Sequence, residues 1–299
     1  MNEEFAVDVR FYRLSEELQP YFTALYSFTI ECADDFLVED RLHPEWSAMR
    51  FTESGMPPLA AITPDEVAPT YPFVASGPTS RAIKFGLTKS RIWGLGLQPA
   101  GWARYVSAPA RTIADAIVDA SEMQCFSIFA PLLEEVRTAS PNVDETARRI
   151  NAYLLEQRGS EPANMDKVIA CQEALRDPEL ADVAMLCERL DMGRRTLERL
   201  CGRYFGFPPK MLIRRQRFLR SLARFMLNPR GNWSKAMDMQ YFDHAHFVRD
   251  FRSFMGMTPT EYANAPHPVL DRIMAQRMAD QGAAPQTDMP SVLRYAAAE

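Results

Sequence analysis

The sequence predicts an α+β protein, in which a small N-terminal β-barrel or sandwich with closing helices precedes an all-α domain of seven helices. Residues 5–110 are rich in proline, aromatic residues and short alternating runs, which is typical of strands and turns. From residue 165 onwards apolar residues recur three and four positions apart, as in amphipathic helices. Within this second half one stretch is repeated 50 residues later, which indicates one structural unit used twice.

The composition limits the class of protein. A chain of 299 residues is long enough for two cores, and 47% apolar with 24% charged residues is typical of a soluble globular protein. No run of 18 apolar residues predicts a membrane span, and the acidic start does not resemble a signal peptide. The five scattered cysteines include no CxxC pair, which favours reduced thiols. We therefore expect a cytoplasmic protein.

The charges are unevenly distributed along the chain. Residues 1–166 carry 14 Lys and Arg against 24 Asp and Glu, whereas residues 167–265 carry 17 against 11. A basic module joined to an acidic one indicates a polyanionic partner for the basic module only.

The N-terminal half predicts strands first and helices later. "SAMRFTES" (47–54) and "RAIKFGL" (81–87) alternate apolar and polar residues over strand lengths. The segments 113–136 and 144–159 place apolar residues three and four apart, so we expect helices that close this domain. The resulting division is an N-terminal domain of strands and then helices (1–157), a linker (158–165), a helical domain (166–265) and a partly disordered tail (266–299).

The helical half is divided by proline and glycine. Breaks at Pro178, Gly193, Gly206, Pro229 and Gly256 separate seven predicted helices. The expected ranges are 166–176, 181–189, 194–204, 209–227, 232–239, 243–254 and 259–264. One further short helix is expected over 269–281, before a mobile end.

The repeated unit occurs at 191–212 ("DMGRRTLERLCGRYFGFPPKML", the first unit) and 241–262 ("YFDHAHFVRDFRSFMGMTPTEY", the second unit). At an offset of 50 residues, arginine, glycine and proline are each found at the same place in both units. These pairs are Arg199 with Arg249, Gly206 with Gly256, and Pro209 with Pro259.

Each unit predicts a helix with one apolar face and one cationic face. Leu197, Leu200, Cys201 and Tyr204 form the apolar stripe of the first helix, and arginines occupy its opposite side. A short amphipathic helix and a tight break precede each of these helices, which is the helix-turn-helix arrangement. An arginine can donate two hydrogen bonds to guanine, which contributes about 1–3 kcal/mol of base discrimination. The linking helix would span roughly 27 Å, close to the ~34 Å repeat of successive major-groove segments.

The segment 166–264 resembles the DNA-binding domain of the AraC/XylS family of bacterial transcription regulators. The second unit carries the resemblance with Asp243, His246-Phe247, Arg249, Phe251, Gly256, Thr258-Pro259 and Tyr262. The resemblance implies a double helix-turn-helix of seven helices. Gly193 and Gln240 depart from the family, which usually has Ser and Gly at these two places.

The resemblance also implies which side chains meet DNA. Base contacts are expected from Arg195, Glu198, Arg199, His244, Ala245 and Arg249. Phosphate contacts are expected from Arg203, Lys210, Arg214, Arg215, Arg252 and Thr258, the last at a helix N-terminus. Taken singly, each arginine could equally lie on a solvated helix face; the repetition of the same pattern in both units favours DNA.

The N-terminal half resembles the degenerate cupin-like sensory domains that precede this module in other regulators. Because His43 is its only histidine, we expect no metal, and a metal site at His244 and His246 is disfavoured since residues two apart diverge on a helix. Candidate pocket residues are aromatic, although such residues are more often simply core: Trp46, Phe73, Phe85, Trp93, Trp102 and Tyr105. No GxSxG, P-loop, GxGxxG or HExxH pattern supports an enzyme or a cofactor.

The sequence thus predicts a bacterial transcription regulator that reads two groove segments. Its expected partners are double-stranded DNA, RNA polymerase, a small-molecule effector and a second copy of the chain, with no membrane. Activation is the family's commoner mode. Two alternatives remain: an interaction adaptor whose DNA contact is secondary, and an enzymatic N-terminal domain.

Overall fold

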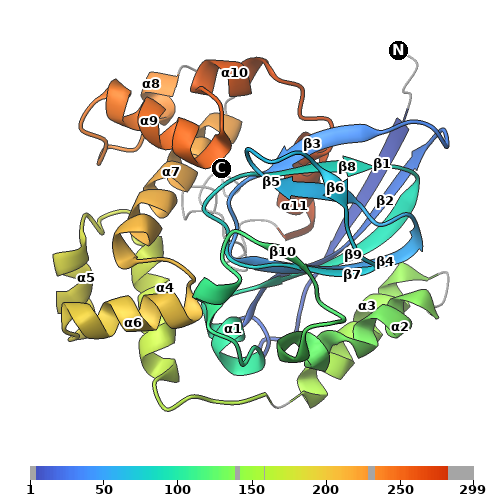
Figure 1. The fold of residues 1–299 in the computed structure, drawn as a ribbon, viewed down its shortest axis with the longest axis horizontal. Coiled ribbons are helices and arrows are strands. Elements are labelled where there is room, and N and C mark those ends of the chain that lie inside the picture. Colours follow the sequence, from blue (N-terminus) through green and yellow to red (C-terminus); the bar gives the residue numbers. More distant parts are fainter. Residues whose placement is uncertain (1–4, 139–141, 158, 228–232, 282–299) are drawn as a thin grey trace.

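The structure is a computed structural model and describes residues 5–138, 142–157, 159–227 and 233–281. Its N-terminal half contains two antiparallel sheets that face each other (Figure 1). The larger sheet has the strand order β1 (Phe5–Tyr12), β2 (Phe22–Cys32), β9 (Ser90–Leu97), β4 (Ser47–Gly55), β7 (Phe73–Ser76), β10 (Ile117–Asp119). The smaller sheet has the order β3 (Val38–Leu42), β8 (Ile83–Leu87), β5 (Leu59–Ile62), β6 (Ala68–Pro69).

The strand register follows from burial of apolar side chains at the centre of the larger sheet. Leu95 of β9 lies opposite Leu25 of β2 on one side and Met49 of β4 on the other. All three side chains are buried. Since side chains alternate between the two faces of a sheet, a slip of one residue would expose this set, and the register is therefore fixed by the core.

The predicted helix over 113–136 is wrong in its first half. Residues Ile117–Asp119 form β10 and pair with β7, and a short 3-10 helix follows (η2, Gln124–Phe129). The apolar spacing of this segment fits either structure, and pairing with an open sheet edge decides in favour of the strand. Helices close the domain only afterwards, as α2 (Pro131–Arg137) and α3 (Val143–Glu156).

The seven predicted helices of the second half are all present, within three residues at each end. They are α4 (Met165–Arg176), α5 (Val183–Leu190), α6 (Arg194–Tyr204), α7 (Pro209–Leu227), α8 (Trp233–Ala236), α9 (His244–Met255) and α10 (Pro259–Asn264). They lie beside the sheets, with the long α7 between the two repeated units (Figure 1). Within the described ranges, none of the helices has the length and apolar character needed to cross a membrane.

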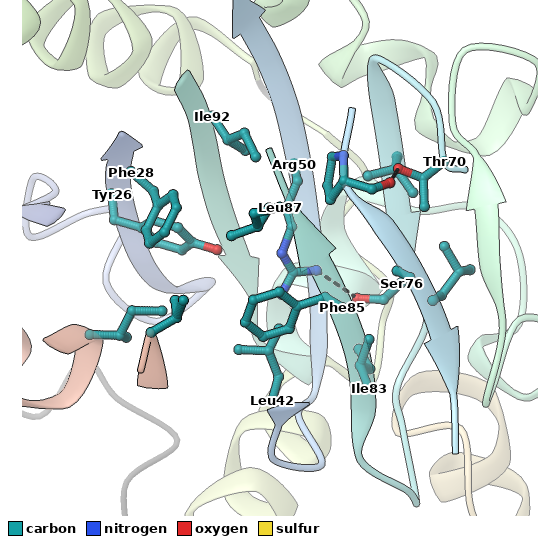
Figure 2. A pocket seen from close by; sticks show the side chains of 16 residues that line it. Tyr26, Phe28, Leu42, Arg50, Thr70, Ser76, Ile83, Phe85, Leu87 and Ile92 are labelled. Atoms are coloured by element: carbon teal, nitrogen blue, oxygen red, sulfur yellow. Dashed lines mark hydrogen bonds between the residues drawn. The ribbon is translucent and has the colours of Figure 1, made fainter. Parts of the chain in front are cut away.

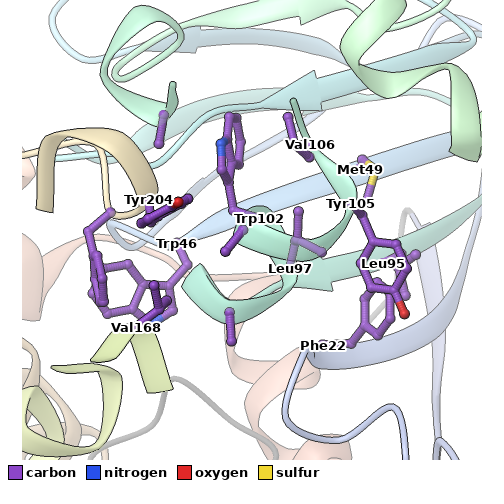
Figure 3. Close-up of a cluster of buried hydrophobic side chains, with 14 of the residues drawn as sticks. Phe22, Trp46, Met49, Leu95, Leu97, Trp102, Tyr105, Val106, Val168 and Tyr204 are labelled. Atoms are coloured by element: carbon purple, nitrogen blue, oxygen red, sulfur yellow. The ribbon is translucent and has the colours of Figure 1, made fainter. Parts of the chain in front are cut away.

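Buried apolar residues form one large core that runs from the N-terminal half into the first unit. It includes α1 (Pro99–Tyr105), which contributes Trp102, and also Val168 of α4 and Leu197 of α6. Figure 3 shows Val168 and Tyr204 of the helical half beside Trp46 of the β-domain. The second unit is built around a separate core, which includes Phe218, Phe247 and Phe251.

The helix expected over 269–281 is present as α11 (Leu270–Gln281). It packs against β1 and β3 of the N-terminal half, so the chain returns to the β-domain after the second unit (Figure 1). The partial disorder expected for the tail concerned the residues after this helix. That prediction, at 282–299, lies outside the described residues.

Candidate nucleic-acid interface

Helix α6 separates its apolar and polar residues onto opposite faces. Leu197, Leu200, Cys201 and Tyr204 are buried. The four predicted contact residues on this helix are all exposed: Arg195, Glu198, Arg199 and Arg203. Glu198 pairs with Arg194 at 3.1 Å, one turn away, and both side chains are open to solvent. The carboxylate can therefore change partners at little cost, because an exposed ion pair contributes at most about 1 kcal/mol.

Helix α9 has the same arrangement as α6. Unlike α6, its N-terminus is capped by a side chain. The side chain of Asp243 accepts a hydrogen bond from the amide of His246 at 2.6 Å, which caps the helix. Phe247, Phe251 and Phe254 are fully buried beneath it. The remaining predicted residues are exposed: His244, Ala245, Arg249 and Arg252.

The arginines on these outer faces are free of internal carboxylates. In the part of the chain that the structure describes, Arg195, Arg199, Arg249 and Arg252 form no salt bridge, although many other arginines of this half do. Arg249 and Arg199 occupy the same place in the two units, and both are exposed. The two outer faces therefore carry unneutralised positive charge that an external anion can meet.

Much of the remaining positive charge of this half is neutralised inside the molecule. Buried Asp250 of α9 pairs with Arg214 at 2.6 Å and with Arg217 at 3.3 Å. Buried Asp238 pairs with Arg220 at 2.7 Å. Arg214 was a predicted phosphate contact, and its guanidinium instead ties α7 to α9. Because these aspartates are already subtracted in the net charge counted from the sequence, the pairing decides which arginines remain available at the surface and does not change the net excess.

Arg215, another predicted phosphate contact, does not lie on the surface at all. Its side chain is 1% exposed and enters the β-domain from α7. One guanidinium nitrogen donates to the backbone oxygens of Glu45 and Thr79, at 3.1 and 2.9 Å. The guanidinium also stacks over the ring of Trp46 at 3.7 Å. Phosphate cannot reach this group in the observed arrangement, so the prediction is corrected: Arg215 holds α7 against the β-domain.

The predicted phosphate site at Thr258 is also corrected. The Thr258 amide donates to the Glu261 carboxylate at 2.6 Å, and the Thr258 hydroxyl accepts from the Glu261 amide at 3.1 Å. This reciprocal capping box engages the Thr258 and Glu261 amides, so neither is free for an anion in the observed arrangement. Lys210, at the start of α7, is exposed as expected.

The turn before α9 contains two apolar side chains that the sequence reading did not select. Met239 and Phe242 are 95% and 93% exposed. Phe242 precedes the capping residue Asp243, where an apolar residue usually packs back against the first turn of the helix. Here the Phe242 side chain is exposed to solvent instead. Two uncovered apolar side chains, Met239 and Phe242, therefore lie in the turn beside α9. In the same turn, the side chain of Gln240 donates to the backbone of Pro178 at 2.6 Å and joins the turn to the first half of the helical module.

A cavity lies between the two sheets of the β-domain (Figure 2). Its volume is about 70 Å3 and its walls are mainly aliphatic and aromatic, including Phe28, Leu87 and Ile92. Arg50 supplies the main polar group, held by Glu45 at 2.9 Å and Ser76 at 3.4 Å. Since Glu45 already balances this cation, the cavity suits an apolar molecule better than an anion.

The aromatic residues proposed from the sequence line this cavity only at Phe85. Phe73, Trp93, Trp102 and Tyr105 belong to the large core, and Trp46 stacks under Arg215. Five of the six candidates therefore do not line this cavity. The wall residues that the sequence did not predict include alternate residues on strands β2, β5, β8 and β9 (Tyr26, Phe28, Ala60, Ile83, Leu87, Ile92).

Metal-binding clusters are not found among the described residues. The ring of His246 lies edge-on to Tyr241 and its Nε2 is 3.3 Å from Arg217, so it packs and hydrogen-bonds within the second unit. His244 is exposed on α9.

Comparison with known proteins finds a family match for one segment of the helical half. Residues 186–265 match the family described as a helix-turn-helix domain, a segment that includes both α6 and α9. No curated protein sequence matches the chain. Among solved structures, ToxT from Vibrio cholerae is similar at 10% identity, with a TM-score of 0.42, over 87% of this chain and 98% of that chain. A ToxT structure described as bound to an unsaturated fatty acid is similar at 12% identity, with a TM-score of 0.42, over 88% and 95% of the two chains. The AraC-like transcriptional activator CuxR is similar at 14% identity, with a TM-score of 0.28, over 73% and 87%.

Proposed function

We propose that this chain, whose C-terminal module is a DNA-binding helix-turn-helix domain of the AraC type, is a transcription regulator that reads two successive major-groove segments with α6 and α9. The observation that carries the proposal is the repeated outer face. Two helices related by a 50-residue offset each bury one face and expose unpaired arginines on the other. An α-helix fits the major groove, and arginine donates to guanine O6 and N7.

The exposed residues divide into two roles. We assign base contacts to Arg195 and Arg199 on α6 and to His244, Ala245 and Arg249 on α9, where the methyl group of alanine suits the thymine methyl. Glu198 can accept from cytosine N4 when it leaves Arg194. Phosphate contacts are assigned to Arg203, Lys210 and Arg252, which fix orientation without reading sequence.

The acidic N-terminal half is proposed to control this DNA binding through a small apolar molecule in the cavity near Arg50. In this scheme the protein acts in the bacterial cytoplasm and activates transcription with RNA polymerase as partner. The alternative, an adaptor in which DNA contact is secondary, predicts a stable heteromeric complex that survives nuclease treatment.

Selection of preferred duplexes from a random pool, at a fixed and stated salt concentration, provides the reference site. Arg249→Ala should then weaken specific binding by about 1–3 kcal/mol and relax the preference at one base pair. Arg252→Ala is the matched control on the same helix, and it should weaken specific and random duplexes alike while reducing the salt dependence. Equal losses on specific and random duplex for Arg249→Ala would refute base reading by this residue.

The use of both helices is tested by the spacing of the two half-sites. Inserting about 5 base pairs between them turns one half-site to the opposite face of the duplex, whereas about 10 base pairs restores the face but lengthens the span. Because one continuous helix of fixed length links the two readers, both insertions should lower affinity to that of a single half-site. Unchanged affinity after either insertion would contradict simultaneous reading.

A further inference from the structure

The two repeated units are attached to the β-domain in different ways. The first unit shares the large core with it, through residues such as Leu197, Tyr204 and Trp46 (Figure 3). The second unit has its own core, and among the buried described residues only Ala82 of the β-domain takes part in it. The long helix α7 crosses the boundary, with Leu212 and Ile213 in the first core and Phe218 onwards in the second. The second unit is thus the one that can move without opening the large core.

A small set of specific contacts holds the second unit against the β-domain. The amide of Ala82 donates to the carbonyl of Phe254 at the end of α9, at 2.7 Å. Gly256, with a φ of 71°, lies directly against Thr63, and an added Cβ would come within 2.3 Å of its methyl group. Both Ala82 and Thr63 lie at the ends of strands that form the cavity wall, since Ala82 precedes β8 and Thr63 follows β5.

A second attachment follows α10, where residues 266–274 run back to the β-domain; this segment is called the strap below. Tyr262, just before it, is hydrogen-bonded through its hydroxyl to His43 at 2.8 Å. The buried carboxylate of Asp40 then accepts from the amides of Val269 and Leu270 at 2.9 and 2.8 Å, which caps the start of α11. His267 lies 3.5 Å from the same carboxylate.

The strap also closes the cavity. Val269 and Ile273 form part of the wall of the 70 Å3 cavity, beside Phe28 and Phe85. On the other side Leu270, Ile273 and Met274 line a second cavity of about 150 Å3, between the β-domain and α7. Arg50 and Tyr26 line both cavities, so the strap lies where the two spaces meet. A molecule that extends from one space into the other would therefore contact the strap side chains.

We propose that the strap is an internal lid that competes with an apolar ligand for the cavity mouth, and that its release frees the second unit, together with the C-terminal half of α7 on which its core is packed, to tilt relative to the first unit. The proposal deepens the ligand control put forward above and rests on it. An apolar ligand replaces the contacts of Val269 and Ile273, and so weakens the anchor that Asp40 and His43 provide. In consequence, cavity occupation changes the position of α9 relative to α6, and with it the half-site spacing that the protein accepts.

The test uses the full chain without DNA and measures amide hydrogen exchange. Ile273→Asp places a charge among the apolar side chains at the cavity mouth, where Ile273 is half-buried, and should release the strap, since a charge is disfavoured against an apolar wall. Exchange in α9 and α10 should then rise by about tenfold or more, while exchange in α6 stays as in the wild type. Ala275→Asp introduces the same charge at an exposed position of the same helix and should leave both regions unchanged.

Two results would overturn the lid: unchanged exchange in α9, or an equal rise in α6 and α9. If Ile273→Asp does not fold, Ile273→Ala provides the same comparison with a smaller but still selective rise. Because DNA is absent, a failure here leaves the base-reading proposal intact, and a failure of the Arg249 experiment does not affect this one.

Competition with a ligand is measured with the neutral apolar fluorophore N-phenyl-1-naphthylamine. Ile273→Ala removes side-chain volume from the cavity mouth, so the fluorophore should bind this variant several-fold more tightly than the wild type. In the wild type, saturation with the fluorophore should raise exchange in α9 and leave α6 unchanged. Equal affinities in the two proteins, no binding by either, or binding without any change in α9 would overturn the competition.

Discussion

Replacing Arg215 with alanine removes a cation that joins α7 to the β-domain. The guanidinium is buried, donates to two backbone oxygens, of Glu45 and Thr79, and stacks 3.7 Å over the ring of Trp46. Hydrogen bonds from a charged donor contribute about 1.5–3 kcal/mol each, and a desolvated cation–π contact contributes about 2 kcal/mol. Against this, alanine relieves the desolvation of a buried cation, which costs several kcal/mol. The expected net loss in the free energy of unfolding is about 3 kcal/mol.

The assay is denaturant unfolding at neutral pH, with the free energy compared at a common slope. Arg203→Ala is the matched control, because Arg203 is exposed on α6 and its loss should change stability by no more than about 0.5 kcal/mol. Arg215→Lys should recover little of the loss, since an ammonium group can neither stack on indole nor present the same planar fork. If Arg215→Ala is as stable as Arg203→Ala, the role assigned to this contact is refuted.

Three further predictions follow from the structure. Asp243→Ala removes the cap of α9 and should lower the free energy of unfolding by about 1 kcal/mol. It should also weaken DNA binding, and specific binding at wild-type strength would contradict that expectation. Gly256→Ala should destabilise the protein by more than about 1 kcal/mol, because φ is 71° and the new methyl group meets Thr63. Adding Thr63→Ser removes the threonine methyl group from this contact. The double variant should therefore regain part of the lost stability in thermal unfolding. Burial lowers the pKa of His43 to about 4. The folded protein therefore binds fewer protons than the unfolded chain between about pH 6.5 and about pH 4. As a result, the free energy of unfolding falls as the pH falls through this window. The hydrogen bond to Asp40 raises the pKa of His267, whose contribution is present below about pH 6.5 and is lost at higher pH. His43→Gln should therefore reduce the loss of stability between about pH 6.5 and about pH 4.5 by about 2.5 kcal/mol, whereas exposed His244→Gln should leave the profile unchanged.

The sequence by itself determined the helices of the second half and the faces of α6 and α9. These features depend on short-range periodicity: Leu197 and Leu200, or Phe247 and Phe251, recur at the spacing that makes one side of a helix apolar. Caps such as Asp243 are also local, since the side chain bonds to an amide three residues away. The exposure of Arg199 and Arg249 follows from the same periodicity, because a residue opposite the buried stripe faces outwards. Their contact with DNA remains a prediction.

Only the tertiary structure decided which partners are contacted by side chains whose partners lie far away in the sequence. Arg214 and Arg215 are neighbours on α7, yet one pairs with Asp250 of α9 and the other enters the β-domain. The cavity wall combines strands from across the domain with α11, which the periodicity of residues 269–281 predicts as a helix but does not place. A local pattern states which side of an element is apolar, and the long-range packing decides what covers that side. The buried arginines, the cavity and the strap are therefore properties of the assembled fold.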